Sequence, residues 1–166
     1  MSFFALALAL SAPVAEAASY QDLLPMDRLV ERADRVIRGD ILTTRSVMTD
    51  NGIFTIATIA VQETLRGPHE AITEIRIPGG KLNGLELQVN GAPRVIAGDQ
   101  MLLFLKNGAI VGLSQGAMLV AGDLAWRPGR LGAFSAPMPY REWLSQLEPN
   151  GDYEAWNLED VRSALR

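Results

Sequence analysis

The stretch from Ala33 to Gly67 constrains the fold more than any other part of this chain. It contains two long extended segments joined by the polar turn Asp50-Asn51-Gly52. Two strands of this length cannot bury their apolar side chains alone, because an isolated hairpin is only marginally stable in water. The rest of the chain must therefore supply more sheet. Within the first segment, Gly39 is expected to mark a bend, a bulge or a close approach of another backbone.

The second extended segment changes its hydrophobic phase partway along. Phe54 and Ile56 share one parity, whereas Ile59 and Val61 share the other. Alternate side chains of a strand point to opposite faces, so such a change indicates either a bulge near Ala57-Thr58 or a strand covered on both sides. Both features are typical of a sheet that curls into a barrel.

Further strands are expected downstream, at residues 71–77, 85–89, 101–105, 110–113 and 117–120. The continuous apolar run Met101 to Leu105 predicts the most buried of them. Asn107-Gly108 is the strongest short-range hairpin signal in the chain. A short hairpin with Pro128-Gly129 at its tip is expected to complete the β region near Phe134.

Helices are expected before and after these strands. Pro25 suits the first position of a helix whose apolar stripe is Met26, Leu29, Val30 and Ala33. A second stripe comprises Tyr140, Trp143, Leu144 and Leu147, and a third, after the N-cap candidate Asn157, comprises Leu158, Val161 and Leu165.

The sequence thus predicts a mainly β protein: a closed or partly open antiparallel β-barrel of OB-like form, with one short N-terminal helix and two C-terminal helices. A barrel is preferred over a sandwich because of Gly39 and the phase change. Residues 18–134 would form the barrel domain with its N-terminal helix, and residues 135–166 a helical C-terminal extension packed on the barrel.

Residues 1–17 are expected to be a signal peptide. Phe3 to Ala12 is an apolar run, Pro13 ends it, and Ala15-Glu16-Ala17 offers small residues for cleavage before Ala18. The run is about half of the ~20 residues that span a bilayer, so no membrane insertion is expected after cleavage. No Lys or Arg precedes the run, which leaves three alternatives: an upstream start, an atypical signal or a buried N-terminal helix. Export predicts a periplasmic or secreted protein.

Composition narrows the functional classes. The chain has no cysteine, which excludes disulfides, thiolate metal sites and a cysteine nucleophile. Its net charge is −4, from 15 basic and 19 acidic residues, without a basic run. This balance argues against nucleic acid and against an anionic membrane surface as partners. No cofactor and no metal ion are expected.

One motif invites a catalytic hypothesis. Gly112-Leu113-Ser114-Gln115-Gly116 matches the G-x-S-x-G nucleophile elbow, which lifts a serine out of a strand-to-helix turn. The apolar segment after it is too short and too closely bounded by glycine for the required helix. The only histidine, His69, precedes Ser114, whereas the hydrolase order places it after. We therefore interpret Ser114 as structural and predict that the protein is not an enzyme.

Two sets of residues are candidates for binding. Pro78-Gly79-Gly80-Lys81 lacks the following helix of a phosphate-binding loop, because Leu82-Asn83-Gly84 begins another turn. It is expected to be a flexible loop between strands, and loops on a rigid barrel commonly carry contacts. The candidate binding loop comprises Pro78, Gly79, Gly80, Lys81 and Asn83. The candidate aromatic contacts are Trp126 and Trp156, which could also be core residues.

Residues 33–41, followed by a threonine-rich strand that ends in Glu63-Thr64-Leu65-Arg66-Gly67, resemble the opening of netrin-like domains, the OB-type barrels of tissue inhibitors of metalloproteases. The chain is also similar to uncharacterised bacterial secreted proteins that share the pattern of residues 98–105. The resemblance covers roughly Ala33 to Leu113 and implies a barrel and export. Those inhibitors use an N-terminal cysteine to reach the protease metal, and this chain has none, so the resemblance does not extend to metal chelation.

The expected function is that of an exported, non-catalytic β-barrel protein that binds a protein partner, either a secreted protease or an envelope component. A carbohydrate- or small-ligand-binding barrel is the alternative. A serine hydrolase that uses Ser114 is a third hypothesis. The sequence specifies neither the identity of the partner nor the oligomeric state.

The signal-peptide hypothesis is tested by the N-terminus of the exported protein. Mass spectrometry of protein recovered after export should show a chain that starts near Ala18, because the domain closes its core without residues 1–17. A recovered protein that retains Phe3 to Ala12 would contradict the hypothesis.

Overall fold

The computed structural model describes residues 23–129, 139, 141–142 and 153–166. The predicted signal peptide lies outside these residues. So does most of the predicted helix that contains Trp143, of which Arg141 and Glu142 are described and are helical.

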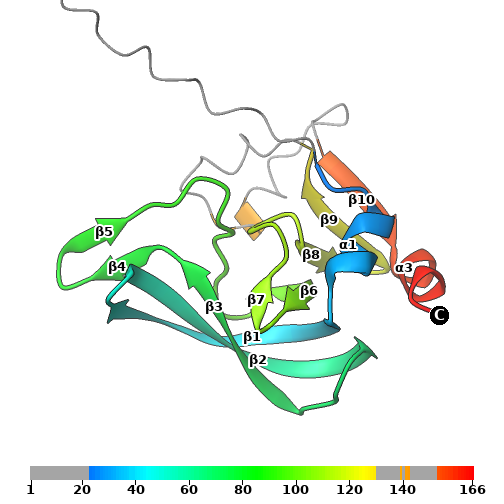
Figure 1. Ribbon diagram of the computed structural model, residues 1–166, viewed down its shortest axis with the longest axis horizontal. Coiled ribbons are helices and arrows are strands. Elements are labelled where there is room, and N and C mark those ends of the chain that lie inside the picture. Colours follow the sequence, from blue (N-terminus) through cyan, green and yellow to red (C-terminus); the bar gives the residue numbers. More distant parts are fainter. Residues whose placement is uncertain (1–22, 130–138, 140, 143–152) are drawn as a thin grey trace, which may run out of the picture.

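The described chain is mainly β, with two complete helices, one near each end (Figure 1). The elements are α1 (Met26–Arg32), β1 (Arg35–Thr49), β2 (Gly52–Arg66), β3 (Ile72–Pro78), β4 (Gly80–Leu82), β5 (Leu85–Leu87), β6 (Gln100–Lys106), β7 (Ala109–Ile110), β8 (Ala117–Ala121), β9 (Leu124–Pro128), β10 (Tyr153–Asn157) and α3 (Leu158–Ala164).

The strands form one large antiparallel sheet and one small hairpin. The large sheet has the order β10-β9-β8-β6-β1-β2-β3, with β7 paired to β6, and β4 pairs with β5 separately. The sheet curls enough that β3 and β7 pack against each other. No ladder joins β3 to β7 or to β10 in the part of the chain that the structure describes. The mainly β, antiparallel prediction is confirmed, whereas a closed barrel is not.

The long hairpin β1–β2 has the form that the sequence predicts. It pairs from Thr49↔Gly52 at the turn to Val36↔Arg66 at the far end, with three shifts of register on the way. Gly39 lies at one of these shifts, where an added Cβ would be 2.4 Å from the carbonyl oxygen of Ala60. The expected close backbone approach is therefore present, and no larger residue fits.

The phase change in β2 has a different origin from the one expected. A register shift does lie opposite Thr58, but the extra residue is Leu42 on the partner strand. Ile53, Ala57 and Ile59 are the buried residues of β2 and lie on one face of the strand. Phe54 lies on the other face, half-buried, with the guanidinium of Arg76 at 5.4 Å from its ring centroid. Arg76 thus covers the out-of-phase residue Phe54 on the outer face.

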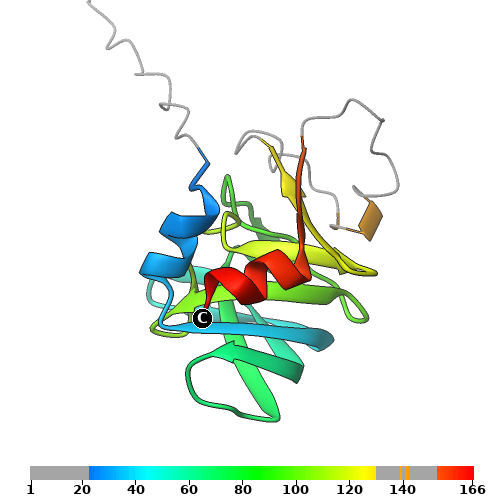
Figure 2. The ribbon, with the colours of Figure 1, turned by 90° about the vertical axis from the view of Figure 1, so that its right-hand side faces the viewer.

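Strand β6 lies at the centre of the molecule and is buried on both faces, as its apolar run predicts. One core cluster contains its odd-numbered residues and side chains from β1, β2, β3 and β8: Ile37, Ile41, Ala57, Ile59, Ile75, Ile77, Val95, Met101, Leu103, Leu105, Ala117 and Leu119. The other contains its even-numbered residues together with residues of both helices: Leu29, Ala33, Val36, Leu102, Phe104, Val111, Met118, Val120, Ala125, Leu158 and Val161. Helices α1 and α3 lie side by side over this second face (Figure 2).

The expected partners of Phe104 need correction. We predict from the sequence that Phe104 packs against Ile59 and Val61, but Ile59 belongs to the first cluster, Val61 packs against that cluster, and Phe104 belongs to the second. Successive side chains of a strand point to opposite faces, so Leu103 and Leu105 meet Ile59 while Phe104 meets the helices.

Helix α3 is held on the sheet by an ion pair. Arg162 donates from Nε and Nη2 to the two carboxylate oxygens of Glu63 on β2, at 2.8 and 2.9 Å. These hydrogen bonds hold the pKa of Glu63 below its usual value. The predicted N-cap of this helix is confirmed, because Asn157 accepts a hydrogen bond from the backbone N–H of Glu159 at 2.8 Å.

The other local predictions have mixed outcomes. Helix α1 forms with Leu29 buried, although Pro25 is its N-cap and not its first helical residue. Asn107-Gly108 closes the β6–β7 hairpin with positive φ at both residues, 51° and 76°, as expected. The β8–β9 hairpin turns at Gly122-Asp123, not at Pro128-Gly129, and Pro128 is the last residue of β9.

The C-terminal part differs most from the prediction of a helical extension. Residues Tyr153–Asn157 form β10, which pairs with β9 and so belongs to the large sheet. The alternation in this segment is too short to indicate a strand without the edge of β9 beside it. Residues 153–157 are therefore part of the β structure, and helix α3 follows them.

Truncation of Phe104 tests the second core. Phe104→Ala should lower the free energy of unfolding by roughly 3–5 kcal/mol, as large-to-small changes at fully buried sites do. Chemical denaturation of the purified protein measures the loss. Ile72→Ala is the matched control, because Ile72 is 60% exposed, and it should change stability by less than about 0.5 kcal/mol. Equal midpoints for Phe104→Ala and the parent would contradict the strand assignment.

Candidate functional site

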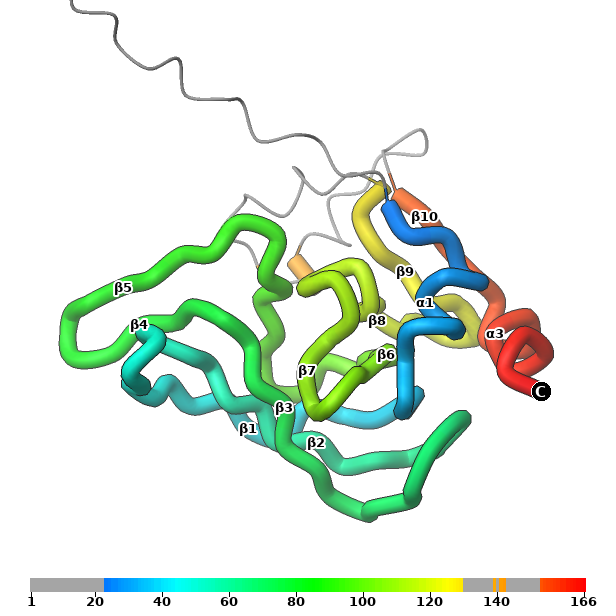
Figure 3. Tube along the Cα trace, viewed as in Figure 1, coloured from blue at the N-terminus to red at the C-terminus, as the bar shows by residue number. Residues whose placement is uncertain are grey.

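The β4–β5 hairpin and the segment 88–96 line a groove. The backbone of the hairpin lies beside the turn end of β1 and β2 (Figure 3). The volume of the groove is about 360 Å³. The described lining residues are Thr44, Arg45, Ser46, Thr55, Ile77, Pro78, Gly79, Gly80, Lys81, Glu86, Leu87, Gln88, Val89, Asn90, Ala92, Pro93, Arg94, Val95 and Ile96.

Most of the candidate binding loop lies in this groove. Pro78, Gly79, Gly80 and Lys81 all line it, and Asn83 lies outside it in the β4–β5 turn. The prediction therefore located one wall of a groove, but missed the walls from β1 and from residues 92–96. The residues of those walls are distant from the loop in the sequence and come next to it only in the folded structure, so no local motif indicates them.

The loop is pinned, contrary to the expectation of a flexible connection. Gly79 donates its backbone N–H to Ile53 at 2.9 Å, and its carbonyl accepts from the hydroxyl of Thr55 at 2.9 Å. The backbone N–H of Lys81 donates to Ser46 Oγ at 3.2 Å. Residues Gly80–Leu82 then form β4. This side of the groove is consequently preformed, which lowers the entropic cost of binding.

Gly80 makes this close packing possible. An added Cβ at Gly80 would lie 2.7 Å from Ser46 Oγ and 2.8 Å from Thr55 Oγ1. Its φ of 146° is also a conformation that L side chains rarely adopt. Glycine is therefore needed at position 80, where β4 packs closely against the end of the β1–β2 hairpin.

The opposite wall is held by a buried carboxylate. Asp99 Oδ2 accepts the backbone N–H of Ile96 at 2.9 Å, and Asp99 Oδ1 lies 3.4 Å from Arg141 Nε. Burial raises the pKa of Asp99, an effect that the Ile96 N–H and Arg141 partly offset. Further along the wall, the carbonyl of Gly91 accepts from the backbone N–H of Ser114 at 2.9 Å.

The lining favours binding by hydrogen bonds and apolar contacts. Arg45, Lys81 and Arg94 are its cationic residues, and Glu86 is the one carboxylate among the described lining residues. Arg45 also pairs with Glu74 at 3.3 Å, on the exposed face. The lining also contains hydroxyl and amide side chains together with Ile, Val, Leu and Pro.

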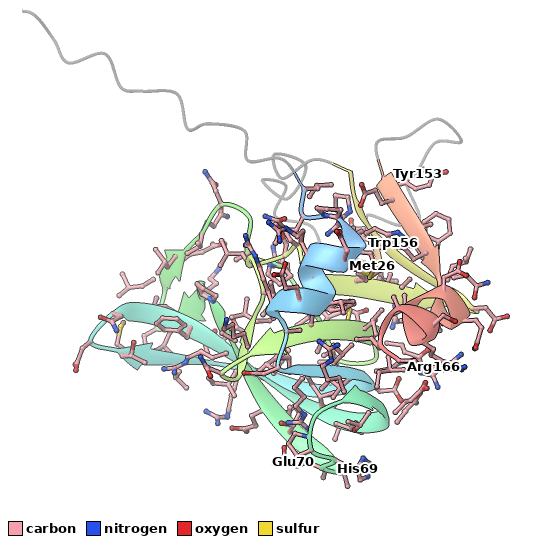
Figure 4. All side chains as sticks on the ribbon, turned by 45° about the vertical axis from the view of Figure 1, so that its right-hand side comes forward. Met26, His69, Glu70, Tyr153, Trp156 and Arg166 are labelled. Carbon is pink, nitrogen blue, oxygen red and sulfur yellow. The ribbon has the colours of Figure 1, made fainter. Side chains whose placement is uncertain are left out.

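The structure does not bring Ser114 and His69 together. Ser114 is fully buried in the turn between β7 and β8, and its hydroxyl has no hydrogen-bond partner in the described chain. The imidazole of His69 is exposed and bonds Thr64 Oγ1 at 3.0 Å. Figure 4 shows His69 at the end of the molecule opposite Tyr153 and Trp156. The turn needs its glycines, because a Cβ on Gly116 would be 2.9 Å from the carbonyl oxygen of Phe104.

The two candidate aromatic contacts lie away from the groove, on β9 and β10. The ring of Trp126 is 5.2 Å from that of Tyr153, and Trp156 lies 4.5 Å from the guanidinium of Arg127. Trp126 is opposite Ala155 in the ladder, so the two tryptophans point to opposite faces. Each is half-buried. They do not form one common platform.

Sequence reasoning missed the most heavily bonded side chain of the described structure, Arg127. It is fully buried and donates to Glu154, to the carbonyl of Gln115 at 2.9 Å and to the carbonyl of Leu24 at 2.6 Å. A lone arginine before a proline carries no signal of burial. The one indication is its position two residues after Ala125 on the same strand. Alternate residues of a strand share a face, and Ala125 is also buried.

Ser114→Ala separates a structural serine from a catalytic one. Because the hydroxyl is buried without a partner, its removal should leave stability unchanged or raise it by up to about 1 kcal/mol. Urea denaturation measures the effect, and Gly116→Ala, which forces a Cβ onto the backbone of Phe104, is the destabilising control. Labelling of Ser114 in the folded parent by a serine-reactive probe would contradict a structural role.

No group of three or more acidic or imidazole side chains is placed to hold a metal ion in residues 23–129, 139, 141–142 and 153–166. No helix within the same residues is long and apolar enough to cross a membrane. Comparison of the chain with protein-family models, with curated proteins and with solved structures finds no match.

Proposed function

We propose that this protein is an exported, non-catalytic binding protein whose groove holds part of a protein partner. The observation that carries the proposal is the pinned loop Gly79–Lys81, which supports a preformed groove of about 360 Å³ with both polar and apolar walls. A preformed groove of this kind and size is typical of a binding site.

The partner that fits best is a protein of the same compartment, either a secreted protease or an envelope component. The apolar N-terminal run and its small-residue cleavage site support export. We also propose that the curled sheet is a partly open barrel of the OB type. The packing of β3 against β7 supports this, as does the resemblance of residues 33–113 to netrin-like domains.

A protein partner is preferred over a carbohydrate because of the groove's composition. The described lining residues include no aromatic side chain, and Trp126 and Trp156 lie elsewhere, in contact with Tyr153 and Arg127. Stacking on an aromatic ring would be the main apolar contact available to a sugar. The lining offers instead aliphatic side chains, which suit the side chains of a peptide.

Site-specific photo-crosslinking in exported protein tests the proposal. A photoreactive residue in place of Gln88, which is exposed and lines the groove, should capture one defined envelope or secreted protein. The same residue in place of Asp123, in the exposed β8–β9 turn, is the control and should not capture it. Equal capture at both positions would contradict a site in the groove.

A further inference from the structure

The β4–β5 hairpin has an open edge. Strand β5 pairs with β4 on one side and with no other strand in the part of the chain that the structure describes. All three of its residues are exposed. The hairpin projects from the body of the molecule, with β5 on its outer side (Figures 1 and 3). A strand edge of this kind is a template for pairing with another chain.

The turn geometry determines which backbone groups face outward. Asn83-Gly84 is a two-residue turn with φ of 49° and 82°, and Leu82↔Leu85 is the pair that closes it. Hydrogen-bonded and non-hydrogen-bonded pairs alternate in an antiparallel ladder, so Glu86 belongs to a non-hydrogen-bonded pair. Its N–H and C=O therefore point away from β4. Outside the ladder, the described backbone hydrogen bonds include none to Glu86.

The side chains along this edge form an amphipathic surface. Leu85 and Leu87 share one face of β5 and are 60% and 39% exposed. This face is turned toward the β1–β2 turn, since a Cβ on Gly52 would lie 3.2 Å from Leu87 Cδ2. Met48, close to that turn, is 54% exposed. An added strand with apolar residues at alternate positions would cover this apolar surface.

The charge of Glu86 distinguishes between two chains that could pair with the edge of β5: a second copy of this protein and a basic segment of another protein. The Glu86 carboxylate accepts one hydrogen bond, from Gln88 at 3.2 Å, and forms no ion pair within the described residues. A second copy of this chain that paired through the same edge would place two Glu86 side chains opposite each other, which is unfavourable. A lysine or arginine at that position would be favourable instead, because opposite charges on facing residues of two strands attract.

We infer that β5 accepts an extended, basic, amphipathic segment of the partner protein as an added strand. The grounds are the open edge of β5, the outward-facing backbone of Glu86 and the charge of its carboxylate. The inference rests on the proposed function, because it specifies how the partner docks at the hairpin that borders the groove. The backbone of Glu86 supplies the pairing, Leu85 and Leu87 the apolar contact, and the Glu86 carboxylate the preference for a cation.

Two capped peptides of alternating sequence, valine with lysine and valine with glutamate, are suitable probes in an NMR titration of the full mature protein. The lysine peptide should shift the Glu86 backbone amide in a saturable way and bind at least fivefold tighter than the glutamate peptide at low salt. The difference should shrink at about 1 M salt, where screening shortens the range of charge interactions to about 3 Å. Absence of saturable binding by the lysine peptide at millimolar concentration would overturn the inference.

Variants at Glu86 separate backbone pairing from charge. Glu86→Pro removes the outward N–H without removing a ladder donor, so the hairpin should persist while peptide binding falls at least tenfold. Protection of the amides of Gly80 and Leu87 from hydrogen exchange verifies the hairpin. Glu86→Gln should bind both peptides about equally, and Glu86→Lys should reverse the preference.

Unchanged peptide binding by a folded Glu86→Pro variant would overturn strand addition. If crosslinking at Gln88 still captured the partner, the groove would remain its site and the proposed function would stand. Loss of the crosslink in the parent, with peptide binding intact, would count against the proposed function alone. Concentration-dependent dimers of the parent that Glu86→Pro abolishes would show a second copy to be the occupant and would overturn the assignment of a basic segment.

Discussion

The buried guanidinium of Arg127 holds together the parts of the chain that local sequence does not connect. Its Nε and Nη2 donate to Glu154 on β10, at 2.9 and 2.6 Å, and its other donors reach the carbonyls of Gln115 and Leu24. Gln115 in turn accepts the N–H of Leu24 at 2.6 Å. Arg127 is fully buried while Glu154 is 40% exposed, so loss of the carboxylate would leave a buried guanidinium charge without its anionic partner. The entry to α1, the β7–β8 turn and β10 therefore depend on one side chain.

The molecule thus has a well-packed part, which contains β6, the helices and β8–β10, and a more exposed part, the β4–β5 hairpin. Strand β6 is covered on both faces, and the helices and β8–β10 add to the side that Arg127 ties together. The β4–β5 hairpin has three exposed residues in β5 and rests on the long hairpin through Ser46, Thr55 and Gly79. Segments with few buried apolar contacts open at lower free energy than the core does. The proposed binding surface thus lies outside the core.

How much of this could be predicted from sequence depends on the range of the determining contacts. The Asn107-Gly108 hairpin, the Asn157 cap and the burial of Met101–Leu105 follow from neighbouring residues, and all three are confirmed. The face of Phe104 was predicted wrongly, because it depends on which elements cover each side of β6. The groove joins Ser46 to Lys81, 35 positions apart, and no local pattern encodes that contact. Arg127 was missed for the same reason.

The short edge at β5 reconciles two opposing requirements. An exposed strand edge invites uncontrolled pairing, and proteins limit this with short edges and with charges placed on them. Here the edge is three residues long and carries Glu86 at the one position whose backbone faces outward. The charge that disfavours pairing between identical copies is the same charge that would favour a strand bearing lysine or arginine. Protection against self-association and selection of a basic partner can therefore come from a single carboxylate, without any change in the backbone geometry of the hairpin.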